Sequence, residues 1–182
     1  MTDPENRVVS DTDNHFHALL RANVSRFVST QGRRLDGVDV KVLDIAPQDH
    51  EGARPYFPSA DIRTLDIDPA ADADYTADLC QNNSQLIADD TFDVIVCTEV
   101  LEHTENPFRA TDELYRMLRV GGTALISTPF NFRIHGPLPD NWRFTEHGLR
   151  QLLSSFTRVT ITELEDPNRF LAPIQYTVIA LK

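Results

Sequence analysis

Two aspartates stand at the ends of two predicted strands, where a carboxylate could bind a sugar ring. Asp44 is near the end of the β-branched run 38–45, and Asp66 ends the run 61–66. In an open parallel sheet, a carboxylate at such a position can accept hydrogen bonds from both hydroxyls of a ribose. Because Asp commonly ends strands, Asp66 alone is a weak signal, and the ordered motifs around it strengthen the hypothesis.

A second group of candidate residues lies in the segment 129–143, which is long for a plain connection in a compact domain. The segment contains His135, Asp140, Arg143 and the chain's only tryptophan, Trp142. A histidine there could take a proton from a substrate hydroxyl, and an indole ring offers an apolar platform to a sugar. We therefore predict that His135 and Arg143 are catalytic and that Trp142 contacts the substrate.

The same segment also has a purely structural interpretation. In that interpretation Asp140 and Arg143 form an ion pair that holds the loop, and Trp142 is buried in the core. For Trp142 and Arg143 both interpretations stay open. For His135 we favour a functional role, because its neighbours in the chain are flexible residues and not an apolar face.

Glu99 and His103 follow the apolar run 92–97 and are spaced so that they would share a helical face. That spacing suits a metal site, but a third ligand at a usable spacing is missing. We therefore expect no metal here. His103 is assigned instead to a structural or cofactor-adjacent role, as a substrate-binding residue.

Strand and helix patterns alternate along the chain, which predicts one α/β domain over residues 1–182. The sheet should be mostly parallel, with helices on both faces and ligands at the carboxyl ends of its strands. Residues 1–11 are polar and aperiodic, and we expect a mobile N-terminus there. The first predicted helix is 12–32, with Gly32 as its stop. The second runs from Pro107 to the glycines at 121 and 122, and the third is capped by Thr145 and runs to Phe156. The predicted strands are 38–45, 61–66, 75–79, 92–97, 123–128, 158–164 and 174–181.

Five motifs follow one another along the chain: VLDI at 42–45, TLDIDP at 64–69, ADL at 77–79, TFDVIVCTEVLEH at 91–103 and ELYRMLRVGG at 113–122. Together they resemble the class I S-adenosylmethionine-dependent methyltransferases, and in particular their type 11 subgroup. The loop 131–145 is also similar to a loop of bacterial methyltransferases encoded near glycan-biosynthesis genes.

The resemblance implies a Rossmann-like sheet of seven strands with the last strand antiparallel. It implies S-adenosyl-L-methionine as cofactor, and methyl transfer to a hydroxyl or amine of a small molecule or glycan. Asp66 would bind the ribose, Asp78 and Leu79 the adenine, and Thr98 and Glu99 the methionine end. The full set of implied cofactor-binding residues is Asp44, Ile45, Ala46, Asp66, Ile67, Asp78, Leu79, Thr98 and Glu99.

The turn after the first strand departs from the family pattern, which places two or three glycines there. The stretch from Ala46 to His50 has none, and no glycine occurs between Gly37 and Gly52. Side chains restrict positive φ, so either the turn takes a different path or cofactor binding is weaker. The departure leaves an alternative function open, a catalytically inactive binding or scaffold protein with the methyltransferase fold.

Composition narrows the choice of partners. The net charge is −11, from 28 acidic and 17 basic residues, which argues against nucleic acid as the main partner. No apolar run reaches the length of about 18 residues that a membrane helix needs, and no secretory signal is visible. We therefore expect a cytoplasmic protein whose partner is a small-molecule or glycan substrate, and the sequence leaves the oligomeric state open.

Overall fold

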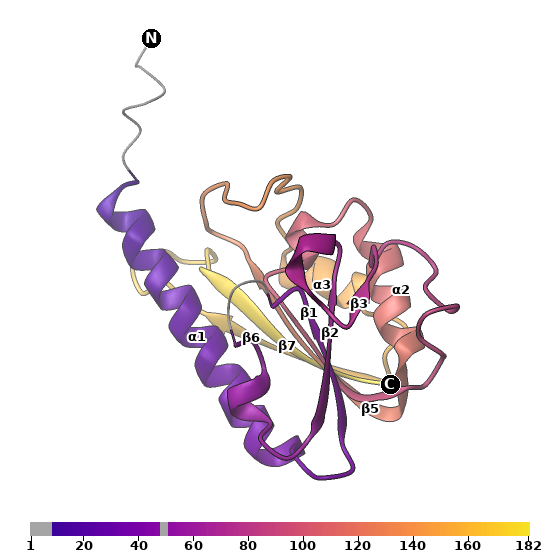
Figure 1. Cartoon of the computed structure of the whole chain (residues 1–182). Helices are drawn as coiled ribbons and strands as arrows, with labels where there is room; N and C mark the ends of the chain where they lie inside the picture. Colours follow the sequence, from indigo (N-terminus) through magenta and orange to yellow (C-terminus); the bar gives the residue numbers. More distant parts are fainter. Residues whose placement is uncertain (1–8, 48–50) are drawn as a thin grey trace.

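A seven-stranded sheet organises the chain in the computed structural model, which describes residues 9–47 and 51–182 (Figure 1). The strand order is β3-β2-β1-β4-β5-β7-β6. Only β7 runs antiparallel to its neighbours, β5 and β6, which confirms the predicted Rossmann-like sheet. The strands are β1 (Lys41–Ile45), β2 (Asp61–Asp66), β3 (Tyr75–Thr76), β4 (Phe92–Thr98), β5 (Leu118–Pro129), β6 (Arg158–Leu164) and β7 (Gln175–Leu181).

One face of the sheet is covered by the long helix α1 (Asp11–Leu35), drawn in indigo in Figure 1. Val28 of this helix belongs to a buried cluster with Val42 of β1 and Val94 of β4. The helix begins after Ser10, whose side-chain oxygen accepts a hydrogen bond from the backbone N–H of Asp13.

The predicted end of this helix at Gly32 is wrong, because the helix continues to Leu35. A Cβ atom at position 32 would lie 2.2 Å from the carbonyl oxygen of Tyr56. Glycine at this position therefore permits the close approach of the chain that follows β1, and it is not a helix stop.

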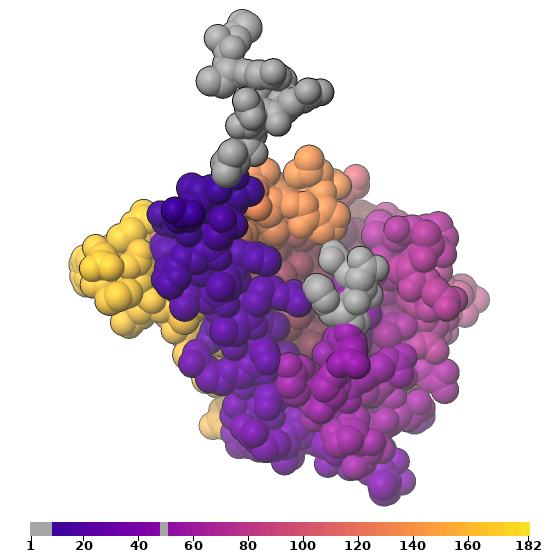
Figure 2. Space-filling view, turned by 60° about the vertical axis from the view of Figure 1, so that its left-hand side comes forward, coloured from indigo at the N-terminus to yellow at the C-terminus, as the bar shows by residue number. Residues whose placement is uncertain are grey.

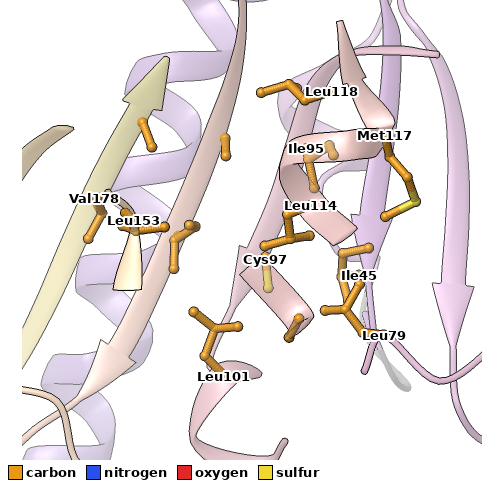
Figure 3. Packing of buried hydrophobic residues seen from close by; sticks show 14 of the residues in the cluster. Ile45, Leu79, Ile95, Cys97, Leu101, Leu114, Met117, Leu118, Leu153 and Val178 are labelled. Carbon is orange, nitrogen blue, oxygen red and sulfur yellow. The ribbon is translucent and has the colours of Figure 1, made fainter. Parts of the chain in front are cut away.

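The opposite face is covered by α2 (Pro107–Met117) and α3 (Glu146–Leu152). Leu114 and Met117 of α2 pack with Ile95 and Cys97 of β4 in the larger buried cluster (Figure 3). Since successive strand residues point to opposite faces, β4 supplies Val94 and Val96 to one cluster and Ile95 and Cys97 to the other. The near-continuous apolar run at 92–97 is thus explained by burial on both faces.

Short 3-10 turns make up the remaining described helical structure, and β5 is longer than predicted. These turns are η2 (Arg54–Tyr56), η3 (Pro69–Ala71) and η4 (Leu101–His103). The strand β5 begins at Leu118, which pairs with Phe92 ahead of a register shift in the β4–β5 ladder. For that reason α2 ends at Met117, earlier than the glycines at 121 and 122 had indicated.

The mobile N-terminus expected over residues 1–11 falls largely on residues 1–8, outside the described residues. The described part of the chain contains no helix long and apolar enough to cross a membrane.

Candidate functional site

The carboxyl ends of β1 and β4 border a pocket of about 290 Å³. These two strands are neighbours in the sheet, and the chain continues from β1 to one side and from β4 to the other. Ligands in open α/β sheets bind at such a switch point. The predicted cofactor residues that line the pocket are Asp44, Ile45, Ala46, Thr98 and Glu99, and α1 adds Arg21, Val24, Ser25 and Val28.

Asp44 is a buried carboxylate in the wall of this pocket. Its Oδ2 atom accepts a hydrogen bond of 2.7 Å from the backbone N–H of Ala53. Burial raises the pKa of Asp44 to about 6, although the Ala53 N–H and the charge of Arg54 act in the opposite direction. Gly52 has a φ of 58°, and a Cβ atom there would lie 2.1 Å from Asp44 Oδ2, so only glycine fits.

Ala46 begins the turn that the sequence singled out for its lack of glycine. Its φ is 50°, the left-handed region that glycine usually occupies, and its backbone N–H donates to the carbonyl of Leu65 at 2.7 Å. The backbone at Ala46 therefore has the conformation that glycine usually adopts, although Ala46 carries a methyl group. Residues 48–50, including Gln48 and His50, lie outside the described residues.

The adenosine-binding residues implied by the resemblance lie one or two strands away from the pocket. Asp66 ends β2, and among the described residues it uses only Oδ1, which accepts from the backbone N–H of Asp68 at 2.9 Å. Asp78 accepts from the N–H of Cys80 at 2.8 Å.

The two apolar members of that group have very different environments. Ile67 is exposed, whereas the side chain of Leu79 is buried in the larger core cluster beside Ile45 (Figure 3). Ile67 can therefore cover a ligand with its side chain. Leu79 can reach a ligand only through its backbone.

Glu99 is fixed by a network that spans the sheet. Its Oε1 atom accepts from Ser127 Oγ at 2.7 Å and from Gln175 Nε2 at 2.8 Å, and Gln175 Oε1 accepts from Asn23 of α1. Burial raises the pKa of Glu99, while the two hydrogen bonds that it accepts lower it. The sequence carried no signal for Gln175 or Asn23, because their contacts join distant elements.

The loop between β5 and α3 brings His135, Asp140 and Arg143 together. Asp140 accepts from Arg143 Nη2 at 2.7 Å, and its Oδ2 lies 3.1 Å from His135 Nδ1. The Arg143 guanidinium holds the pKa of Asp140 well below its usual range. Burial lowers the pKa of His135, and the nearby Asp140 charge partly offsets that effect.

Arg143 also donates from Nη1 and Nη2 to carbonyls of the same loop, those of Trp142, Phe132 and Arg133. The ion pair of the structural interpretation is therefore present. In this geometry Arg143 positions Asp140, and Asp140 positions His135.

Trp142 fastens the loop to the turn η4. Its indole Nε1 donates to the carbonyl of Thr104 at 2.9 Å, and the ring stacks on Phe144. The backbone N–H groups of Asn141 and Trp142 both donate to the carbonyl of Glu102. Trp142 remains 41% exposed, so it is not buried in the core and one part of the ring stays available to a substrate.

The loop also lies beside α1. Figure 2 shows the segment around residue 135, in orange, next to the first half of the indigo helix. The rings of His17 and Phe132 stack with their centroids 6.3 Å apart. The loop and α1 together therefore border the same edge of the sheet.

Glu102, His103 and His135 meet at this edge. The Nε2 atoms of both histidines lie 3.8 Å from Oε1 of Glu102, whose side chain is fully buried. Burial raises the pKa of Glu102 well above its ordinary value, and the charge of Glu99 raises it further. Glu102 was not among the predicted site residues, although its spacing within Glu99-x-x-Glu102-His103 was a readable signal.

One family of known proteins matches most of the chain. A family described as methyltransferase domain matches residues 14–165. No curated protein is significantly similar in sequence to the chain.

Solved structures with the same fold include three described as SAM-dependent methyltransferases. The one from Methanosarcina mazei has a TM-score of 0.59 and 16% identity, and the match covers 82% of this chain and 95% of that chain. The one from Archaeoglobus fulgidus has a TM-score of 0.64 and 16% identity, with coverages of 86% and 94%. The third, from Thermotoga maritima and described as a possible histamine N-methyltransferase, has a TM-score of 0.60 and 14% identity, with coverages of 92% and 94%.

Proposed function

The chain belongs to the methyltransferase domain family, and from that membership we propose that it methylates a hydroxyl group of a small molecule or glycan. It is an S-adenosyl-L-methionine-dependent methyltransferase. The acceptor and the chemistry at the acceptor are our proposal.

The residues at the strand ends fit the cofactor. Oδ2 of Asp66 accepts no hydrogen bond from any described residue, so it is available to the ribose hydroxyls of the cofactor. Gly52 sits where a side chain would meet Asp44, which leaves the backbone of that turn close to the pocket. Asp44, Ala46, Thr98 and Glu99 would hold the amino acid end of the cofactor. When bound, the cofactor supplies a methyl group on a positively charged sulfur.

One observation carries the choice of a hydroxyl acceptor, namely the imidazole of His135 supported by Asp140. Because a carboxylate can only accept, Nδ1 of His135 carries the proton and Nε2 presents a lone pair. An alcohol must lose its proton as the new bond forms, and a neutral imidazole can accept it.

The acceptor oxygen would take the methyl group that the cofactor supplies, the electron pair of the broken S–C bond would stay on the cofactor, and the hydroxyl proton would go to His135 Nε2. Alignment of the oxygen with the methyl carbon would supply most of the acceleration.

The net charge of −11 disfavours a nucleic acid acceptor. The partly exposed ring of Trp142 favours an acceptor with an apolar face, such as a sugar or an aromatic alcohol.

A product assay tests the proposal. The full chain is incubated with S-adenosyl-L-methionine and a panel of sugars, phenols, aliphatic alcohols and amines, and methylated products are identified by mass spectrometry and NMR. We expect O-methyl products. Products methylated only on nitrogen, or the absence of any product while the cofactor binds, would contradict the hydroxyl assignment.

A further inference from the structure

Three side chains outside the cofactor pocket form a compact group of metal-ligand atoms. We call Glu102, His103 and His135 the Glu-His-His cluster. One ligand atom from each lies within 4.8 Å of the others, and both Nε2 atoms are 3.8 Å from Glu102 Oε1. Ligand atoms bound at about 2.0–2.1 Å to one zinc ion lie roughly 3–4 Å apart, so the cluster needs only a small contraction to hold an ion.

Both imidazoles of the cluster are oriented by oxygen atoms on their far sides. His135 Nδ1 is 3.1 Å from Asp140 Oδ2, and His103 Nδ1 is 3.0 Å from the carbonyl oxygen of Pro139. Each Nδ1 therefore donates its proton outward, and each Nε2 directs a lone pair toward Glu102. An oxygen behind each histidine is the usual arrangement around protein-bound metals, because it fixes the ring and raises its basicity.

Glu102 supplies an independent observation. Its side chain is inaccessible to solvent, and neither carboxylate oxygen has a hydrogen-bond partner among the residues that the structure describes. A buried carboxylate without partners is costly, so it is normally paired or bound to a metal. Among the described residues Arg143 forms no hydrogen bond with Glu102, because its guanidinium binds Asp140 and backbone carbonyls.

We propose that Glu102, His103 and His135 bind a divalent transition metal ion of the Zn²⁺ type. Two imidazoles and one carboxylate are a donor set that suits Zn²⁺, Co²⁺ or Fe²⁺, whereas Mg²⁺ prefers oxygen ligands. Three protein ligands leave a further coordination position open. The imidazoles are 15% and 16% exposed, so an ion can reach the cluster from their edges.

This site could not be predicted from the sequence, because its third ligand, His135, is distant from Glu102 and His103 along the chain. Glu102 and His103 lie in η4, and His135 comes from the loop after β5. The loop is held against η4 by Asn141 and Trp142, whose backbone N–H groups bind the carbonyl of Glu102. Docking of the loop therefore completes the ligand set.

The role of the ion rests on the proposed function. A hydroxyl bound at the open position would be acidified by the metal, and it would lose its proton at neutral pH to a weaker base than an imidazole. In the metal-bound state His135 is thus a ligand, and the proton goes to solvent or buffer. In the metal-free state His135 is the base.

Titration of the full chain with Zn²⁺ tests the site without any assay of turnover. After treatment with a chelator, calorimetry should show one Zn²⁺ per chain. Glu102→Gln and His103→Gln should each weaken binding by at least about tenfold. The matched control is His147→Gln, because His147 is an exposed histidine on α3 outside the cluster. With Co²⁺ as the probe, visible d–d bands should appear in the native chain and be lost in His103→Gln.

The proposal is overturned if the native chain binds no Zn²⁺ at micromolar concentrations, or if both cluster variants bind it as tightly as the native chain. His103 is partly exposed whereas Glu102 is fully buried, so His103→Gln keeps the test decisive if Glu102→Gln does not fold. Titration with S-adenosyl-L-methionine separates the two hypotheses. A chain that binds and uses the cofactor but ignores Zn²⁺ refutes the metal site alone, and one that binds Zn²⁺ but transfers no methyl group refutes the proposed function alone.

Discussion

The turn after β1 and the loop after β5 lie at the same edge of the sheet, but different kinds of bonds hold them. The turn depends on backbone groups: the Ala53 N–H binds Asp44, and the Ala46 N–H binds the carbonyl of Leu65. The loop depends mainly on side chains, with Asp140 between Arg143 and His135.

This difference in bonding predicts how each region responds to substitution. A turn held by backbone bonds constrains shape, so it can tolerate Ala46 where a glycine is expected. In the loop, the charged network fixes the positions of particular side chains. Replacing one of them should therefore change how the acceptor is bound or deprotonated. We therefore expect mutations in the two regions to affect different measurements.

The largest effect should come from His135→Ala. If His135 serves as base or as metal ligand, its loss should lower kcat by about 10²–10³-fold, while the dissociation constant of the cofactor changes little. The two quantities are measured by initial rates on the identified acceptor and by calorimetry. His147→Ala, an exposed change on α3, should leave both unchanged. A comparable loss of cofactor affinity in His135→Ala would show that the two regions are not separable.

The next largest effect should come from Asp66→Ala on the cofactor side. A carboxylate that binds two ribose hydroxyls contributes about 1.5–3 kcal/mol, so cofactor affinity should fall by about tenfold or more. Asp61→Ala is the matched control, because Asp61 is at the opposite end of the same strand. Unchanged affinity in a folded Asp66→Ala protein would remove Asp66 from the site.

Most of the fold was predictable because the sheet is built from local patterns. β2 and β6 have the predicted bounds, and α3 begins after the predicted cap, Thr145. The errors at Gly32 and at the start of β5 have a tertiary cause, since each depends on a distant contact, with Tyr56 and Phe92 respectively.

The site was predictable only where it depends on strand ends. Asp44, Thr98 and Glu99 reach the pocket because the sheet brings its carboxyl ends together. The contact between Glu102 and His135 depends on how the loop after β5 folds back onto η4. No periodicity or spacing in a single sequence carries that information.

Asp44→Asn should have an intermediate effect, on stability. The folded-state pKa of Asp44, about 6, lies above its ordinary value of 3.8, so ionisation of this group disfavours the folded state. The cost is fully present above about pH 6 and disappears as the pH falls toward 4. Asn keeps an oxygen for the Ala53 N–H and removes the charge, so the free energy of unfolding of the cofactor-free protein should rise by about 1–3 kcal/mol at pH 8.

Urea unfolding at pH 8 and at pH 4 measures this difference, with the exposed change Asp39→Asn as the control. The gain should be present at pH 8 and absent at pH 4. A gain of equal size at both values would mean that packing, and not charge, is responsible.

The smallest effect should come from Ala46→Gly, which tests whether the turn already has a productive path. A non-glycine residue at a φ of 50° costs about 1–2 kcal/mol, and the greater freedom of glycine in the unfolded chain offsets about 0.5–1 kcal/mol of that. The free energy of unfolding should therefore rise by at most about 1.5 kcal/mol, whereas Ala70→Gly, at an exposed position without positive φ, should lower it. Cofactor affinity should change by less than about threefold, because the backbone already has the conformation that glycine would give it. Calorimetry with the cofactor measures this affinity. Much tighter binding by Ala46→Gly than by the native chain would mean that the Ala46 methyl group obstructs the cofactor, so that a side chain of the turn, and not its backbone, limits binding.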